Sequence, residues 1–334
     1  MRMFRALKNI LVAAGILALL AALFLFAGRS APRADAEWGM NFSEKHAKNL
    51  GLDPREVYSA FLDDLGVRKF KIAVHWDLLE PERGRFEWTG TDWQMSEAAK
   101  RGAEILPVIG LKVPRWPECH LPAWAAELGV AEREEALREF MRVFVERYRE
   151  NPSVSAWQVE NEPFFSFGEC PARQEGFLER EMELVRAADP GRPIVISDTG
   201  EYSLWWRAAR LGDAVGTTLY RRVWFKQLGI YASYPWPPVF YARRAWLVDK
   251  LFGKEVWDVE LQAEPWGPVL YYDLPLEEQE KSMTLEQFRK NVDFARRTGF
   301  REHYFWGGEW WYWMKEKQGE DAYWQEAKSI FRGE

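Results

Sequence analysis

Two glutamates stand at the ends of strand-like segments in this 334-residue sequence. Residues 157–163 read Trp-Gln-Val-Glu-Asn-Glu-Pro, so an apolar, β-prone run ends at Asn161 and Glu162. Proline cannot donate to a sheet ladder, and the strand is expected to stop there. A second such run, over residues 256–261, carries Glu260. Two facing carboxylates are what cleavage of a glycosidic bond requires, one as proton donor and the other as nucleophile.

Alternatives exist for both positions. Glu264 is a second carboxylate after the later run, but Glu260 is preferred because it lies on the run itself, whereas Glu264 precedes a proline and is expected on the loop. Glu162 also has a plain interpretation as a solvated turn residue. Glu160 has the same strand parity and is interpreted as a buried structural carboxylate. Asn161, beside the proton donor, is suited to bind a sugar 2-hydroxyl.

Composition narrows the class of ligand. Aromatic residues make up 16% of the chain and include 19 tryptophans, an excess that favours stacking on a flat partner such as a sugar. Residues 1–36 hold five of the 45 basic residues and one of the 51 acidic ones, which leaves 40 basic against 50 acidic residues in the remainder. Such a surface is a poor match for nucleic acid. The four histidines are scattered without metal-binding spacing, so no metal and no other cofactor is expected.

The N-terminus predicts a membrane helix. Basic residues precede an apolar run over residues 10–28, and nineteen residues can span a bilayer as a helix. A small-x-small site at 34–36 lies far beyond the run, so an uncleaved anchor is favoured over a cleaved signal peptide, which would make the protein secreted. We expect a basic cytoplasmic segment at 1–9, the membrane helix, a linker at 29–36 and an extracytoplasmic domain at 37–334.

The rest of the chain alternates between strand-like and helix-like segments. Strands are expected at residues 38–42, 70–76, 105–110, 154–159, 193–197, 214–220, 256–261 and 303–306. Helical spacing of apolar residues falls between them, at 53–65, 92–101, 132–150, 174–188, 205–211, 276–297 and 321–331. Eight such units in about 300 residues predict one parallel (β/α)8 TIM barrel. Glu162 then ends the fourth strand and Glu260 the seventh, and both point into one mouth.

A basic and aromatic stretch over residues 223–252 fits no single element of that barrel. It permits three interpretations: a cap over the cleft, contact with a membrane surface, or packing against the core. Core packing is favoured.

Three segments resemble one superfamily. Residues 157–163, with their Asn-Glu-Pro ending, resemble the fourth-strand motif of the retaining (β/α)8 glycoside hydrolases of clan A, which include cellulases, xylanases and β-galactosidases. Residues 76–88 (Trp-Asp-Leu-Leu-Glu-Pro-Glu-Arg-Gly-Arg-Phe-Glu-Trp) resemble the loop after its second strand. Residues 305–311 (Phe-Trp-Gly-Gly-Glu-Trp-Trp) resemble its eighth-strand tryptophan. The resemblance covers most of residues 37–334. Within clan A, the sequence is similar to glycoside hydrolase family 5 or family 39.

The resemblance implies roles for individual residues. Glu162 would be the acid/base and Glu260 the nucleophile of a retaining glycosidase that cleaves O-glycosidic bonds, mainly β, in a polysaccharide or oligosaccharide. Tyr220 matches an aromatic residue or histidine that hydrogen-bonds the nucleophile, and Trp306 would floor the sugar subsite. Many relatives carry an arginine on strand two that orients the nucleophile, whereas the nearest match here is Lys71.

Other residues are candidates for substrate contact. His75 is expected to line the mouth, while Trp76, Trp266 and Trp310 each have two interpretations, substrate contact or loop packing. Two other functions remain open. A transglycosylase on cell-surface glycans would use the same glutamates, and a non-catalytic sugar-binding barrel would keep the tryptophans without needing both carboxylates. The protein is expected to be a monomer.

The only two cysteines, Cys119 and Cys170, follow the third and fourth strands. In a barrel the loops after consecutive strands leave the same face as neighbours, so the sulfurs can approach one another. An extracytoplasmic domain would meet an oxidising environment in which a disulfide persists. A disulfide is therefore predicted, and two unrelated buried thiols are the alternative.

Overall fold

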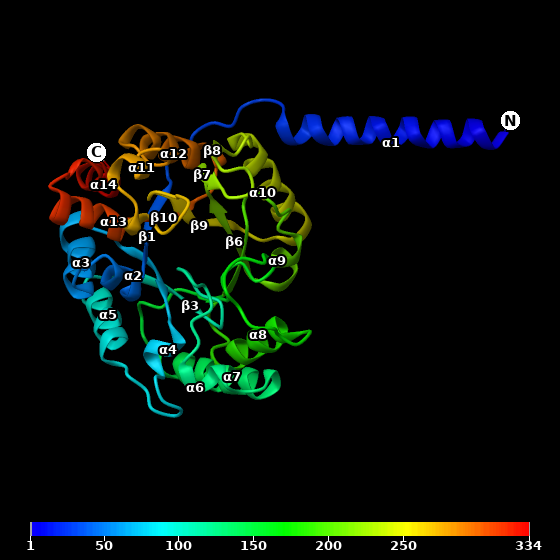
Figure 1. The fold of residues 1–334 in the computed structure, drawn as a ribbon. Coiled ribbons are helices and arrows are strands. Elements are labelled where there is room, and N and C mark those ends of the chain that lie inside the picture. The colour runs from blue at the N-terminus through cyan, green and yellow to red at the C-terminus, as the bar shows by residue number, and fades with distance from the viewer. Residues whose placement is uncertain (1, 334) are drawn as a thin grey trace.

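The computed structural model describes residues 2–333 as a barrel with one long N-terminal helix (Figure 1). Eight parallel strands close on themselves in the order β1-β10-β9-β6-β5-β4-β3-β2, which confirms the predicted TIM barrel. The barrel strands are β1 (Glu37–Phe42), β2 (Lys69–Ala73), β3 (Glu104–Ile109), β4 (Trp157–Val159), β5 (Ile194–Asp198), β6 (Ala214–Leu219), β9 (Val256–Gln262) and β10 (Glu302–Trp306).

Helices surround the barrel because their apolar stripes pack onto the outward side chains of the strands. The longer ones are α5 (Thr89–Lys100), α7 (Val130–Tyr148), α8 (Phe177–Ala188), α10 (Pro238–Phe252), α12 (Leu285–Thr298) and α14 (Ala322–Arg332). Shorter helices are α2 (Glu44–Asn49), α3 (Pro54–Ala60), α4 (Trp76–Leu79), α6 (Ala123–Ala126), α9 (Trp206–Leu211), α11 (Leu276–Gln279) and α13 (Gly308–Trp313). Asp53 caps α3, since its carboxylate accepts the backbone N–H of Arg55 at 2.7 Å.

Three segments differ from the sequence expectation. Residues 223–252 hold an antiparallel hairpin, β7 (Arg222–Phe225) with β8 (Ile230–Ser233), followed by α10, so this stretch extends the loop after β6. The expected helix at 276–297 is two helices, because the chain turns after α11 and Thr284 caps α12 by accepting from the backbone of Gln287 at 3.1 Å. The second strand ends at Ala73, and Trp76 begins α4 instead.

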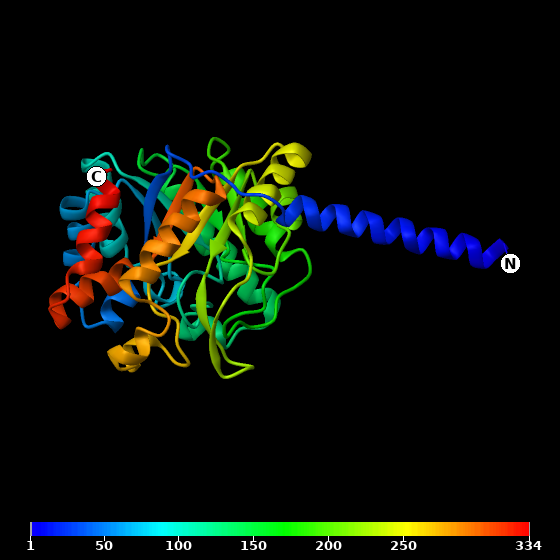
Figure 2. The same cartoon turned by 90° about the horizontal axis from the view of Figure 1, so that it is seen from above.

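Helix α1 (Arg2–Phe26) contains an apolar stretch, Phe4–Phe26, long enough to cross a membrane. Figures 1 and 2 show it leaving the side of the barrel beside α10, and not from either end. Its last turn packs on α10, where the rings of Phe26 and Phe240 stack at 4.9 Å. The linker that follows is held as well: the Arg33 backbone N–H donates to the Arg296 carbonyl at 2.8 Å, and its guanidinium donates to the Gly299 carbonyl at 3.1 Å.

Candidate active site

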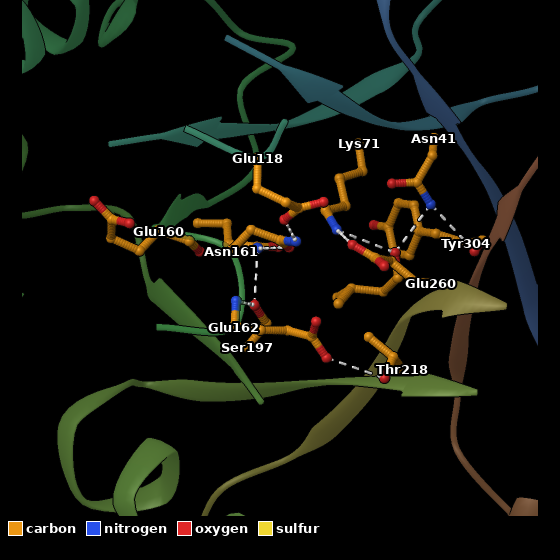
Figure 3. Close-up of polar contacts among 12 residues, drawn as sticks. Asn41, Lys71, Glu118, Glu160, Asn161, Glu162, Ser197, Thr218, Glu260 and Tyr304 are labelled. Atoms are coloured by element: carbon orange, nitrogen blue, oxygen red, sulfur yellow. Dashed lines mark hydrogen bonds and ion pairs between the residues drawn. The ribbon is translucent and has the colours of Figure 1, made fainter. Parts of the chain in front are cut away.

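Glu162 lies just past the end of β4, where a left-handed backbone turn directs its side chain into the mouth (Figure 3). Its φ of 43° is unusual for a residue with a Cβ. Strand β5 stabilises this turn, because the Glu162 N–H donates to Ser197 Oγ on β5 at 2.8 Å. Gln158 Nε2 donates to the same hydroxyl at 3.0 Å. The position of the carboxyl therefore depends on β5 as well as on β4.

The Glu162 carboxyl has few polar partners. It is 7% exposed, and Thr218 Oγ1 donates to its Oε1 at 3.2 Å. The same hydroxyl lies 3.4 Å from Glu201, a buried carboxyl in the loop after β5. Burial, and then the negative charge of Glu260, raise the pKa of Glu162 well above its ordinary value. A carboxyl that keeps its proton near neutral pH is suited to act as a general acid.

Glu260 lies on β9 and points into the same space as Glu162 (Figure 3). It is 2% exposed, and both of its oxygens are engaged. Lys71 Nζ, from β2, lies 2.8 Å from Oε1, and the Tyr220 hydroxyl, from the end of β6, donates to Oε2 at 2.9 Å. Lys71, the nearest match in this sequence to the arginine of the resembled family, thus pairs with Glu260 directly.

Asn161 is held between two side chains and is not free in the mouth. Gln158 Nε2 donates to its Oδ1 at 3.2 Å, and its own Nδ2 donates to Glu118 at 3.3 Å. Glu118 belongs to the loop after β3 and is buried, and burial followed by the charge of Glu260 raises its pKa to about 8 against the pull of Lys112. Besides Glu162, Glu201 and Glu260, the site thus contains a fourth carboxyl, which the sequence analysis did not single out.

Arg115, from the same loop, covers the tryptophan assigned to the sugar subsite. Its guanidinium lies 4.0 Å from the centre of the Trp306 ring, pairs with Glu264, and lies 3.2 Å from Glu309. Burial alone would raise the pKa of Glu264, but Arg115 and His46 outweigh it and hold that pKa at about 2. Glu264 is thus a permanently charged partner of Arg115, which accords with the preference for Glu260 in the mouth.

Backbone strain gathers at this site. Five non-glycine residues among those described have positive φ, and four of them are Arg115, Glu118, Glu160 and Glu162. Such conformations cost free energy and persist where the surroundings enforce them, often at functional sites. The clustering supports a site at the ends of β3 and β4.

The predicted disulfide is present. Cys119 and Cys170 are bonded, with their Cα atoms 5.1 Å apart. Cys119 directly follows Glu118, so the bond ties the β3 loop to the loop after β4. The two loops that carry Glu118 and Glu162 are therefore covalently joined next to the mouth.

The other candidates divide between mouth and core. Trp266 is half-buried at the mouth, with its ring 5.0 Å from that of Tyr220. Trp76 and Trp310 are each 1% exposed; Trp76 packs against Trp124 and Trp310 against Tyr323. Their burial against helix side chains favours the packing interpretation of the two, and substrate contact by either ring stays a prediction.

His75 is buried against His120, with ring centroids 4.3 Å apart. Burial, and then the neighbouring His120, hold the pKa of His75 well below its ordinary value, so it is neutral. His75 contacts the β3 loop through His120. That it lines the mouth stays a prediction.

Five polar residues of the site escaped the sequence analysis: Arg115, Glu118, Ser197, Glu201 and Thr218. Each stands at or just beyond the C-terminal end of a barrel strand, or in the loop after it, which is where a (β/α)8 fold places its chemistry. A systematic listing of polar residues at those ends would have found Ser197 and Thr218. Glu118 lies nine residues beyond β3, so only the folded loop brings it back to Asn161.

No family model matches the chain. Over 189 residues it is 27% identical to endo-1,4-beta-xylanase 3 of Hypocrea jecorina, a match that covers 54% of this chain and 51% of that protein. The chain therefore spans about half the length of the curated relatives it matches.

Solved structures share the fold. Xylanase 10B of Thermotoga petrophila aligns with a TM-score of 0.54 and 16% identity, over 82% of this chain and 83% of that one. Endo-glycoceramidase II of Rhodococcus, solved as a lactosyl-enzyme intermediate, aligns with a TM-score of 0.51 and 14% identity, over 83% and 75%. Together with the xylanase similarity, these confirm the resemblance to the clan A (β/α)8 glycoside hydrolases.

Proposed function

We propose that this chain, a (β/α)8 barrel of the clan A glycoside hydrolase type, is a retaining glycosidase with Glu162 as acid/base and Glu260 as nucleophile. The observation that carries the proposal is the contrast between two carboxyls that share one space. Glu162 has a raised pKa and, within the described part of the chain, one hydroxyl as its carboxyl's donor, whereas Glu260 accepts from an ammonium and a phenol. Environments that differ in this way assign the acid and the nucleophile.

The reaction then runs in two displacements. Protonated Glu162 gives its proton to the glycosidic oxygen as a Glu260 oxygen bonds to the anomeric carbon and the leaving group departs. The Glu162 carboxylate next takes a proton from water, whose oxygen attacks the same carbon and releases Glu260. The Lys71 and Tyr220 contacts keep Glu260 aimed at the anomeric carbon through both steps. The two carboxyls should be about 5–5.5 Å apart, the separation of retaining enzymes.

Substrate class follows from the relatives and the charge of the site. The sequence relatives are xylanases, so xylan and aryl β-xylosides are the first substrates to test. A sugar bound over Trp306 must share the ring with Arg115, which already occupies one face at 4.0 Å. Replacement of that contact by a sugar ring would couple substrate binding to the β3 loop.

Chemical rescue tests the nucleophile. Glu260→Ala should lose turnover of an aryl β-glycoside, and azide should restore it by bonding to the anomeric carbon in place of the missing carboxylate. Glu264→Ala is the matched control, since it removes the other carboxylate that follows β9 and should show no rescue. Full activity of Glu260→Ala, or rescue of the control alone, would overturn the assignment.

We also propose that α1 is kept as an anchor that holds the barrel outside the cytoplasmic membrane. The apolar span and the disulfide both support this placement, because a disulfide persists in an oxidising compartment. The intact mass of the membrane-extracted protein tests it. Loss of the first 30 to 36 residues would show a cleaved signal and a secreted enzyme.

A further inference from the structure

Several exposed apolar side chains of the barrel gather near α9 and α10. Leu204, Trp206, Trp246 and Leu251 are 55%, 41%, 48% and 56% exposed. Trp206 is on α9, Trp246 and Leu251 are on α10, and Leu204 lies just before α9. The two helices contact each other, since Trp206 packs edge-on against Phe252 of α10 with ring centroids 6.1 Å apart. Large exposed apolar groups on one side of a domain mark a surface that something covers.

Helix α1 indicates what covers this side. Phe24 of its last turn packs against Trp246, with ring centroids 5.6 Å apart, and Arg243 lies over the Phe24 ring at 5.0 Å. The C-terminal turn of the apolar span therefore contacts α10 directly. Figures 1 and 2 show α1 running away from the barrel beyond α9 and α10. A bilayer crossed by α1 would meet the barrel on this side first.

Charge on the two helices agrees with a membrane surface. Exposed side chains of α9 and α10 include four basic residues and one acidic residue, whereas residues 37–334 as a whole are acidic. Along α10, Arg243, Trp246 and Lys250 follow at helical spacing on the face opposite the buried Tyr241 and Arg244. Tryptophan with lysine and arginine is the combination that favours the interface of an anionic bilayer.

We propose that these residues form a membrane-docking face, consisting of Leu204, Trp206, Arg210, Trp246, Lys250 and Leu251, that lies on the anionic lipid surface from which α1 emerges. The proposal rests on the anchor proposed above. Tryptophan and leucine enter the headgroup region, and the basic side chains contact lipid phosphates. Because α1 leaves the side of the barrel, docking turns the mouth along the membrane plane, toward glycans that lie close to the surface.

The sequence offers a clean optical test. All 19 tryptophans lie at position 38 or beyond, so α1 contains none, and quenching by lipid reports only on the barrel. The full chain is placed in nanodiscs whose lipids carry brominated acyl chains, and tryptophan emission is compared with that in unbrominated discs. Trp206→Phe/Trp246→Phe should lose at least half of the quenchable emission. Trp116→Phe, a mouth tryptophan that is 45% exposed, is the matched control and should lose none.

Charge reversal supplies an independent arm that leaves the aromatic packing intact. In discs that contain anionic lipid, Arg210→Glu/Lys250→Glu should reduce quenching at least twofold. Arg55→Glu/Lys317→Glu, on α3 and the turn after α13, should not change it. A chain that enters the discs but is unquenched, or is quenched equally in every variant, overturns the docking face alone. A chain that does not enter the discs overturns the anchor and the docking face together.

Discussion

Glu160 and Glu162 are two residues apart on the same turn, and their surroundings differ sharply. The Glu160 carboxylate is fully buried and accepts the backbone N–H groups of Leu111 and Lys112 at 2.7 and 2.9 Å. Arg173 lies 3.0 Å from its Oε2. Among the residues that the structure describes, only the Thr218 hydroxyl lies within hydrogen-bonding distance of the Glu162 carboxyl. The first carboxylate is fully paired within the fold, whereas the second, the proposed acid/base, has a single polar partner in that part of the chain.

The comparison shows how one sequence turn serves two purposes. Gly110 makes room for the Glu160 carboxyl, since a Cβ there would lie 2.6 Å from its Oε1. With Glu160 fixed against the end of β3, the next residues are forced into the mouth. The hydrogen-bonded Glu160 carboxylate thus helps to position the Glu162 carboxyl. The contacts of Glu160 offset the free-energy cost of burying Glu162 in a strained backbone conformation.

The largest expected effect is on catalysis. Glu162→Gln should lower kcat on substrates with poor leaving groups by about 10²–10⁴-fold, because the proton donor is lost, and much less on activated aryl glycosides. Glu160→Gln, measured on the same two substrates at a temperature where it is folded, should lower both rates alike. A leaving-group dependence in Glu160→Gln and none in Glu162→Gln would reverse the assignment.

Stability should change in the opposite order. Glu160→Gln leaves Arg173 without its carboxylate and sets an amide N–H against a backbone N–H, so the free energy of unfolding should fall by about 3–5 kcal/mol. Glu162→Gln replaces a neutral carboxylic acid by a neutral amide of the same shape and should cost less than about 1 kcal/mol. Denaturant titration of both variants gives the two values, and equal losses would contradict the contrast.

Dependence on pH gives the smallest effect and extends the contrast to the neighbouring acids. Burial raises the pKa of Glu201 to about 7 and that of Glu118 to about 8, so the folded protein holds these protons where the unfolded chain has lost them. Their contribution to stability is complete below the ordinary pKa of 4.5 and disappears as pH rises through 7 and 8.

The melting temperature should accordingly fall by about 5 °C or more between pH 6 and pH 9. Glu118→Gln should flatten that fall, whereas Glu127→Gln, at an exposed position after α6, should leave it unchanged. An unchanged slope in Glu118→Gln would mean that Glu118 ionises like a surface residue.

Periodicity was enough to predict the barrel, because alternation of strands and helices admits one parallel closure for eight units. The glutamates at the ends of the fourth and seventh strands followed from the same count. The conformation of the β3 loop could not be predicted in this way. Arg115 contacts Trp306 and Glu118 contacts Asn161 because both have positive φ, which a sequence indicates only where the residue is glycine. The tryptophans of the 305–311 motif were ambiguous for another reason: Trp306 and Trp310 differ in which side of the barrel they face, and that depends on where the strand ends.

If α1 spans a membrane as proposed, the linker that Arg33 fastens to the end of α12 fixes the distance between the barrel and that membrane. Ten residues separate α1 from β1, and a fully extended chain of that length would place the barrel up to about 35 Å from the end of α1. The Arg33 contacts to residues 296 and 299 hold the linker against the barrel, so its free length is shorter. An anchored glycosidase of the kind proposed would then diffuse in two dimensions with the surrounding lipids. It would reach glycan close to the membrane and leave polymer farther away uncleaved.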